Sequence, residues 1–254
     1  MINIILLEPD EQLILKSSPQ TRRKLLNIEI SQLKKDYILY LNNYNKTLKQ
    51  RNFYLRELFI NGNSSLEYLD ILTKKLVDYG VYIYNLRMNF IENINKYLSN
   101  KYQEIFETGE LIIKYNSDYK NKSKDEIFAT YQKNYNKEIN IGKTMLGVHH
   151  DDIIFILDKE DISEMGSNGQ KKNAIFAFKL AEIEIFKEEK GSYPILILDD
   201  LFSALDQKKI KNIFKLLKYD IQTFITTTEL KKIDKKMLKN AKIFNVTIDG
   251  IKEE

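Results

Sequence analysis

The sequence predicts an α/β protein whose layered domain is interrupted by an all-helical arm. The wholly apolar run at residues 193–198 is typical of a strand that is buried on both faces of a parallel sheet. Strand-like and helix-like segments alternate after Glu110, which is the pattern of an α/β layered domain. Residues 31–107 have helical spacing almost throughout, and this change of period marks the arm.

Composition narrows the class of protein. The chain has 254 residues, enough for one large domain or two small ones, with 43% hydrophobic and 30% charged residues. It has no cysteine, which excludes disulfides and cysteine-ligated zinc. The net charge of +4 permits contact with nucleic acid. No apolar run approaches the ~20 residues of a membrane span, and the opening is too short for a signal peptide, so we expect a cytoplasmic protein.

The first elements lead into the arm. Residues 4–7 form a short apolar strand, and a turn at residues 17–19 precedes a helix that begins near Gln20. Large side chains then recur at spacings of three and four, which predicts one stripe of a long helix: Leu33, Tyr37, Tyr40, Tyr44 and Leu48.

A second arm helix follows the break at residues 61–65. Ser64 and Glu67 have the spacing of a capping box, so we expect the helix to begin there. Its large side chains alternate at three and four residues: Leu69, Leu72, Leu76, Tyr79, Ile83, Leu86, Phe90, Ile94 and Tyr97. The two helices are predicted to pair as an antiparallel hairpin. The pattern leaves open whether their seam is a coiled coil or an ordinary helical core.

The remaining segments build the layered domain. We predict strands at residues 111–115, 153–157, 193–198, 221–226 and 243–246, and helices at residues 124–137, 170–189 and 210–217.

Gly142-Lys143-Thr144 has the last three letters of a phosphate-binding P-loop. That motif needs a glycine five residues before Gly142, and Lys137 stands there. The preceding stretch is polar, and Gly147 interrupts the helix that should follow. We therefore expect a turn between a helix and a strand, and the chain contains no other G-K-[ST].

A strand that runs into paired carboxylates is the strongest functional signal. The apolar strand ends at Asp199 and Asp200, and ligands of parallel α/β sheets bind beyond the C-terminal ends of the strands. This suits a Walker B site, in which Asp199 holds Mg²⁺ and Asp200 polarises the attacking water as a general base. A solvated strand end is the alternative, and the sequence SALD at residues 203–206 favours the Walker B interpretation.

The second signal is a polar stretch that opens a strong helix, Ser167, Asn168, Gly169 and Gln170. The N–H groups and partial positive charge of a helix N-terminus can hold an anion such as a γ-phosphate. An ordinary N-cap is the alternative, because Ser and Asn are common there. The position of this helix before the strand at 193–198 makes the phosphate-binding interpretation more specific.

These motifs resemble those of an ABC-type ATPase head, with a signature motif, a Walker B strand and a D-loop that ends at Asp206. The chain also resembles the RecF family of bacterial DNA replication and repair proteins over nearly its whole length. The stretches that carry this resemblance are LLEPDEQLILKSSPQTRRKLL, YNKTLKQRN, GKTMLGVHHDD, GSNGQKKNAIFAFKLAEIEIFKEEKGSYPILILDDLFSALD and QTFITTTEL.

The resemblance implies an organisation and a function. Residues 1–30 would be a head segment leading into the arm, 31–107 the arm, and 108–254 the C-terminal half of an ABC-type head. ATP and Mg²⁺ would be cofactors, with Asp200 catalytic, Asp199 on the metal, and the nucleotide contacted by Ser167, Asn168, Gly169, Gln170 and Asp206. The protein would dimerise, bind single- and double-stranded DNA at gaps, and support recombinase loading with recombination mediator proteins in recombinational repair and the SOS response.

Departures from the family pattern qualify this expectation. Val148 stands where the family usually has proline, and His150 where it usually has arginine. The family's N-terminal segment with its Walker A loop precedes the matching part, so we expect a truncated chain that is inactive alone as an ATPase. The run from His149 to Asp152 has the composition of a metal cluster, but successive side chains on a strand diverge, so we do not expect four ligands on one ion.

Basic residues give the remaining candidates. We expect Arg22, Arg23 and His150 to contact DNA, although most basic runs are solvated helix faces. The alternative function is a non-enzymatic ABC-like head fragment whose arm binds a protein partner.

Overall fold

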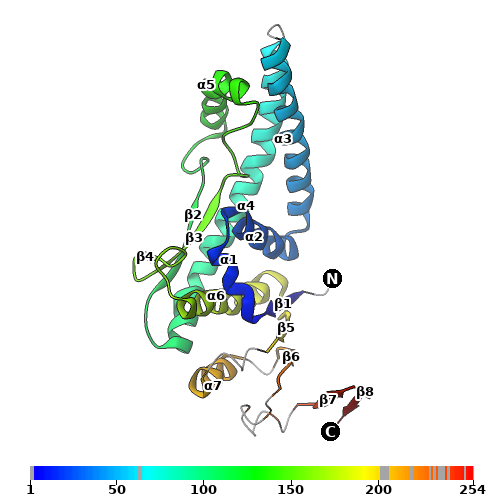
Figure 1. Cartoon of the computed structure of the whole chain (residues 1–254), viewed down its shortest axis with the longest axis vertical. Coiled ribbons are helices and arrows are strands. Elements are labelled where there is room, and N and C mark those ends of the chain that lie inside the picture. The colour runs from blue at the N-terminus through cyan, green and yellow to red at the C-terminus, as the bar shows by residue number, and fades with distance from the viewer. Residues whose placement is uncertain are drawn as a thin grey trace.

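A computed structural model describes residues 3–61, 65–200, 206–217, 220–228, 230, 233, 238, 241–248 and 250–253. Two long helices form an arm at one end of the molecule, with a shorter helix beside them, and most of the remaining elements form a head toward the other end (Figure 1). The elements predicted after Glu110 are all present, with ends shifted by at most four residues. Strand β8 (Gly250–Glu253), which pairs with β7 (Phe244–Thr247), was not predicted.

The arm is the predicted hairpin of α3 (Lys35–Asn61) and α4 (Leu66–Phe106) (Figure 1). Ser65 caps α4, because its hydroxyl accepts a hydrogen bond from the Glu67 N–H at 3.1 Å. The predicted cap, Ser64, lies outside the described residues. Helix α4 buries more than the predicted seam, including Val77, Gly80 and Ile91, because α3, α5, α6 and β2 all pack on it. The seam is therefore part of an ordinary helical core.

The predicted stripe from Leu33 to Leu48 is divided between two helices. Helix α2 (Pro19–Leu33) ends at Leu33, and Lys34 has an extended backbone with φ −124° and ψ 104° before α3 begins. The prediction of one continuous helix there is wrong, because spacings of three and four continue across the single-residue break. Ahead of α2 lie η1 (Pro9–Gln12) and α1 (Leu13–Lys16).

The head contains a parallel sheet with the strand order β1-β5-β6. Its strands are β1 (Ile4–Leu7), β5 (Ile195–Leu198) and β6 (Thr223–Ile225), with α7 (Gln207–Leu216) between the last two in sequence. Helix α6 (Asn168–Lys190) packs on this sheet. Burial alternates along β1 and β5, so only one face of β5 is fully buried in the described structure. The prediction of burial on both faces is wrong there, because an all-apolar run does not reveal how many layers cover it.

A second, antiparallel sheet joins the arm to the head. Strand β2 (Leu111–Asn116) pairs with β3 (Asp152–Leu157), which continues into β4 (Glu160–Asp161). The backbones of Asp158 and Lys159 have positive φ values of 51° and 77° and make the tight turn between β3 and β4. Helix α5 (Lys124–Ile141) returns to the arm and packs on α3 and α4 (Figure 1).

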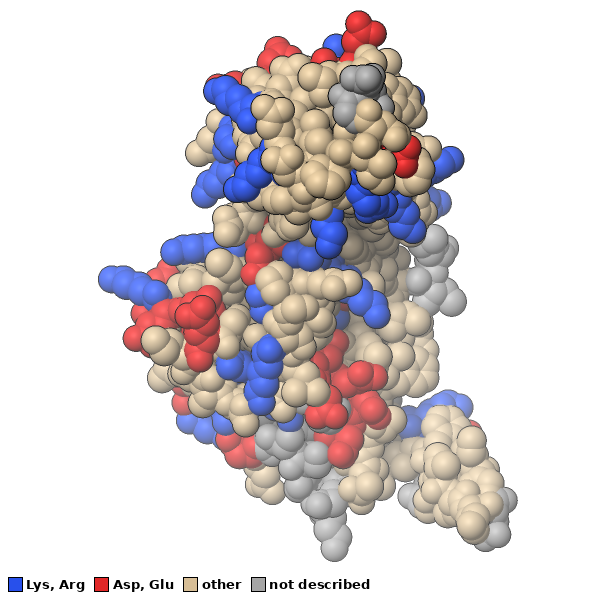
Figure 2. All heavy atoms as spheres, turned by 45° about the horizontal axis from the view of Figure 1, so that its top comes forward, with Lys and Arg blue, Asp and Glu red and all other residues tan. Residues whose placement is uncertain are grey.

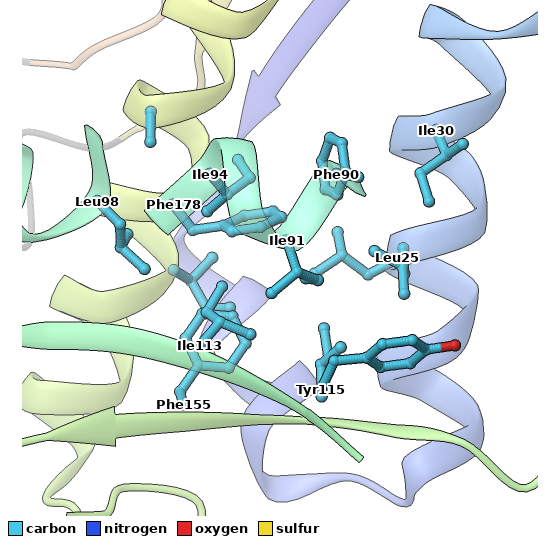
Figure 3. Close-up of a cluster of buried hydrophobic side chains, with 14 of the residues drawn as sticks. Leu25, Ile30, Phe90, Ile91, Ile94, Leu98, Ile113, Tyr115, Phe155 and Phe178 are labelled. Atoms are coloured by element: carbon cyan, nitrogen blue, oxygen red, sulfur yellow. The ribbon is translucent and has the colours of Figure 1, made fainter. Parts of the chain in front are cut away.

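The hydrophobic core lies where α2, α4, α6 and the second sheet meet. Figure 3 shows Leu25 of α2, Ile91 of α4 and Ile113 of β2 pointing into this region. The Phe178 ring of α6 lies edge-on to Phe90 at 6.3 Å and to Phe155 at 5.8 Å, measured between ring centroids. Edge-on aromatic pairs add about 0.5–1.5 kcal/mol to the free energy of burying their area.

Beside this core, the buried Arg87 of α4 is bonded to several elements at once. Its Nε donates to the Tyr37 hydroxyl at 2.9 Å, and its Nη2 donates to Asn27 Oδ1 at 2.9 Å. Its Nη1 donates to the Val148 carbonyl at 2.7 Å and to Asp151 Oδ2 at 3.1 Å. Burial alone would lower the pKa of Arg87, but Tyr37 and other neighbouring groups outweigh it and raise that pKa.

We expect Arg87→Met to lower the free energy of unfolding by about 3–5 kcal/mol, because it leaves the buried Asp151 carboxylate without its cation. Urea denaturation would measure the change. Arg56→Met, at an exposed position of α3, is the control and should stay within about 0.5 kcal/mol of the parent. Equal decreases in the free energy of unfolding of the two variants would show that the hydrogen bonds of Arg87 do not contribute to stability beyond those of an exposed arginine.

Candidate nucleotide and DNA site

The parallel sheet positions Asp199 at the C-terminal end of β5, as predicted. The Asp199 N–H donates to the Leu7 carbonyl of β1 at 2.9 Å. On the other side, the Thr226 N–H donates to the Leu198 carbonyl at 3.0 Å, which holds Thr226 just beyond β6. The Thr226 hydroxyl then donates to Asp199 Oδ1 at 2.5 Å. All three strands therefore help to fix this carboxylate.

Thr226 also holds Asp200. The Asp200 N–H donates to the Thr226 hydroxyl oxygen at 3.0 Å, and Asp200 has a φ of +40°. A left-handed backbone costs a non-glycine residue about 1–2 kcal/mol, so surrounding contacts must maintain it. Thr226 is not among the predicted site residues, although its place at the end of a predicted strand of the same sheet was a usable signal.

The predicted signature residues lie at the exposed N-terminus of α6. The Ser167 hydroxyl accepts from the Gln170 N–H at 3.2 Å, and Gln170 Oε1 accepts from the Ser167 N–H at 2.8 Å. These bonds form a complete capping box, and Asn168 and Gly169 occupy the first turn. Among the described residues, a Cβ on Gly169 would meet only Ser167 Oγ, at 3.9 Å, so their packing does not require glycine there.

The two lysines after the cap have different environments. Lys171 is buried, and its ammonium donates to the Ser163 carbonyl at 2.9 Å. Burial lowers the pKa of Lys172, while the charges of Asp10 and Asp200 act in the opposite direction. The charge of Asp200 therefore acts on the second turn of α6 within one chain.

Asp206 caps α7. Its Oδ1 accepts from the Lys209 N–H at 2.9 Å, and its Oδ2 lies 3.0 Å from the Lys209 ammonium. The hydrogen bond from the Lys209 backbone is the main reason that the pKa of Asp206 is lowered. Its role in nucleotide binding stays a prediction, and residues 201–205, with the rest of the D-loop, lie outside the described residues.

The predicted DNA contacts differ in their accessibility. Arg22 is buried, and its guanidinium binds both Asp152 carboxylate oxygens, at 2.8 and 2.6 Å, and the Ser17 carbonyl at 2.8 Å. Arg23 is half-buried and donates to the Asp151 carbonyl at 2.7 Å. His150 is exposed. A phosphate contact by Arg22 would first require the loss of its bidentate ion pair, and all three DNA contacts stay predictions.

The stretch that resembled a P-loop is the predicted turn. Gly142 ends α5 with a φ of +68°. The Thr144 hydroxyl donates to Asn52 Oδ1 at 2.7 Å and accepts from Arg51 Nη1 at 2.7 Å. Arg51 is fully buried and also bonds Glu138 at 2.7 Å. These residues hold α5 against the arm. The Thr144 hydroxyl makes both of its hydrogen bonds to arm residues.

His149 lies between the arm and this turn. Its Nδ1 is 2.7 Å from the Tyr44 hydroxyl. Burial, reinforced by the neighbouring His150, lowers the pKa of His149 to about 3, so the ring is neutral at neutral pH. Within the described ranges, no group of three or more His, Cys, Asp or Glu side chains is arranged to hold a metal ion.

The fold defines the class: an α/β, ABC-ATPase-like head with an inserted helical arm, which confirms the predicted fold class. A family model described as "Uncharacterised protein conserved in bacteria (DUF2326)" matches residues 119–252. No helix in the described part of the chain is both long and apolar enough to cross a membrane.

The chain is also similar to curated DNA replication and repair proteins RecF. It is 33% identical to the one from Latilactobacillus sakei subsp. sakei (strain 23K), covering 100% of this chain and 70% of that protein. It is 34% identical to the one from Pediococcus pentosaceus, covering 96% and 68% respectively. The chain belongs to the RecF family, and by homology it is a RecF-type DNA replication and repair protein.

Solved structures agree. The "recombination mediator protein RecF-ATP in RecFOR pathway" superposes with a TM-score of 0.86 at 28% identity, covering 100% of this chain and 68% of that one. The corresponding "RecF-ATPrS" structure gives a TM-score of 0.84 at 29% identity, covering 99% and 68%.

The half-buried His149 predicts a pH dependence of stability. Because its folded pKa lies below the unfolded value of about 6.5, the unfolded chain binds the extra proton, and stability is lost as the pH falls from about 6.5 toward 3. Between pH 7.5 and 5 we expect the parent to lose up to about 2 kcal/mol more than His149→Gln. Identical pH profiles for the parent and His149→Gln, measured by urea denaturation, would contradict the prediction.

Proposed function

We propose that this chain acts in recombinational DNA repair and the SOS response in the cytoplasm, as a homodimer that binds single- and double-stranded DNA at gaps. In this proposal ATP and Mg²⁺ modulate binding, and the complex supports recombinase loading with recombination mediator proteins. The observation that carries it is the pair Asp199 and Asp200, held by Thr226 at the carboxyl end of a parallel sheet. The same chain presents the exposed, Ser167-capped α6.

The carboxylate geometry suits a Mg²⁺–nucleotide site. The bond from Thr226 orients Asp199 through one oxygen, which leaves a fixed carboxylate to hold Mg²⁺ directly or through water. Mg²⁺ would neutralise charge on the phosphates. Asp200, turned by its left-handed backbone, would polarise the attacking water as general base.

The signature residues suit a phosphate that is held from outside the chain. Ser167 uses its oxygen as an acceptor within the cap, so its hydroxyl hydrogen can still be donated to an anion. Gly169 leaves the backbone of the first turn open to close approach. We propose that Ser167, Asn168, Gly169 and Gln170 contact the nucleotide of a second head, with Asp206 nearby, which is why the proposal includes a homodimer.

The 254-residue chain alone should not hydrolyse ATP. Phosphoryl transfer depends on positioning and on charge stabilisation by a phosphate cradle, and Gly142-Lys143-Thr144, which lies at the end of α5, does not provide one. A steady-state phosphate-release assay would test this, with Asp200→Asn as the control. Turnover in the parent that disappears in Asp200→Asn would show that the chain contains a complete site.

We expect DNA binding that is independent of base sequence and sensitive to salt, because phosphate contacts by a modestly basic protein carry it. The logarithm of the binding constant should fall with the logarithm of salt concentration at about −0.9 per duplex phosphate neutralised. Titrations of gapped and intact duplexes at several salt concentrations would measure it. Affinity that ignores salt, or that follows one base sequence, would argue against the proposed function.

A further inference from the structure

The tip of the arm exposes large apolar side chains that the head chemistry does not use. They lie on the ends of α3 and α4 that face away from the head: Phe53, Phe59, Ile60, Leu66, Tyr68 and Ile71. Figure 2 brings this end forward and shows a broad uncharged surface, with Lys and Arg at its sides and a few Asp and Glu at its edge. Contiguous apolar patches on soluble domains mark interaction sites.

A groove of about 380 Å³ opens in this surface. Lys49, Gln50, Phe53 and Tyr54 of α3 line it together with Tyr68 of α4. The Tyr54 hydroxyl donates to the Ser65 carbonyl at 2.8 Å, which fixes that ring across the end of the hairpin. The Tyr68 ring stands edge-on to it, with centroids 4.8 Å apart and planes at 88°. Phe53 and Tyr68 are 60% and 48% exposed, so ring surface is available to a ligand.

We propose that this groove binds unpaired nucleotides of single-stranded DNA. Bases would stack on the Phe53 and Tyr68 rings, Lys49 would neutralise a phosphate, and the Gln50 amide would bond a base edge. None of the five lining side chains is a carboxylate. Glu57, one turn beyond Phe53 on α3, accepts a bond from Asn61 Nδ2 at 3.2 Å. The choice of DNA as the ligand rests on the proposed function.

The side-chain chemistry favours a single strand over a duplex. Bases in a duplex stack on one another, so aromatic side chains reach only bases that are unpaired. A basic groove without aromatic rings would serve a duplex backbone equally well. Here exposed aromatic faces and one ammonium share the same groove, which is the combination that single-strand binders use.

Substitution by leucine separates stacking from general apolar contact, because leucine keeps apolar area and removes the ring. Fluorescence anisotropy with a labelled oligo-dT on the full chain should show Phe53→Leu and Tyr68→Leu weakening binding roughly 5- to 150-fold each. Phe53→Tyr should bind like the parent. Lys49→Gln should make the salt dependence shallower by about 0.7 on the log–log scale.

Phe59→Leu is the matched control. Phe59 is 62% exposed on the same helix, but six residues beyond Phe53 it points about 120° away and does not line the groove. Its oligo-dT affinity should equal that of the parent. Equal thermal midpoints would confirm that each variant is folded.

The outcomes separate this proposal from the proposed function. If the parent binds DNA while Phe53→Leu and Tyr68→Leu bind oligo-dT equally well, the groove proposal is overturned and the function stands. That result is also the one expected if the groove holds a protein segment instead. Tighter binding of oligo-U than of oligo-dT would overturn the assignment to DNA. If the chain binds neither single- nor double-stranded DNA, both proposals fail.

Discussion

The buried ion pair between Arg87 and Asp151 sets the relation of the arm to the head. Apolar packing is non-directional, so the interface between α4 and the second sheet does not by itself fix how the arm points. The Arg87 guanidinium has fixed donor directions, and they are matched by acceptors on α2, α3 and the loop before β3. Such a pair repays its desolvation cost only when its hydrogen bonds are made, so the elements that supply the acceptors are held together.

A second buried cation, Arg51, plays the same part nearer the arm tip. It bonds Thr73 of α4, Glu138 of α5 and Thr144. The segment from 142 to 151 therefore runs between two buried arginines. Gly147 within it has a φ of +120°, and a Cβ there would lie 2.5 Å from the hydroxyls of Tyr131 and Tyr44, so only glycine fits. Gly142-Lys143-Thr144, which resemble part of a P-loop, therefore belong to a segment that holds α5, the arm and the head together.

The features that could be predicted from the sequence are those that follow from local hydrophobic periodicity. Helical spacing located the arm, and the apolar run before Asp199 located the central strand. Contacts between distant positions could not be read in this way: Arg87 and Asp151 are 64 residues apart, and Thr226 and Asp199 are 27 apart. The burial of Arg22 has the same origin, because its partner Asp152 is 130 residues away. From the sequence alone, Arg22 and Arg87 could not be distinguished from surface charges, but in the folded chain both form internal ion pairs.

Helix α6 connects these constraints to the candidate site. Its middle carries Lys179, whose ammonium lies 2.6 Å from Glu29 of α2, 3.6 Å from Glu11 of η1 and 3.9 Å from Glu182. Burial, together with the nearby Glu29, raises the pKa of Glu182, while Lys179 acts in the opposite direction. The same helix packs along α4 and β1. These contacts connect α6 to β1, the strand whose Leu7 carbonyl accepts a hydrogen bond from the Asp199 N–H.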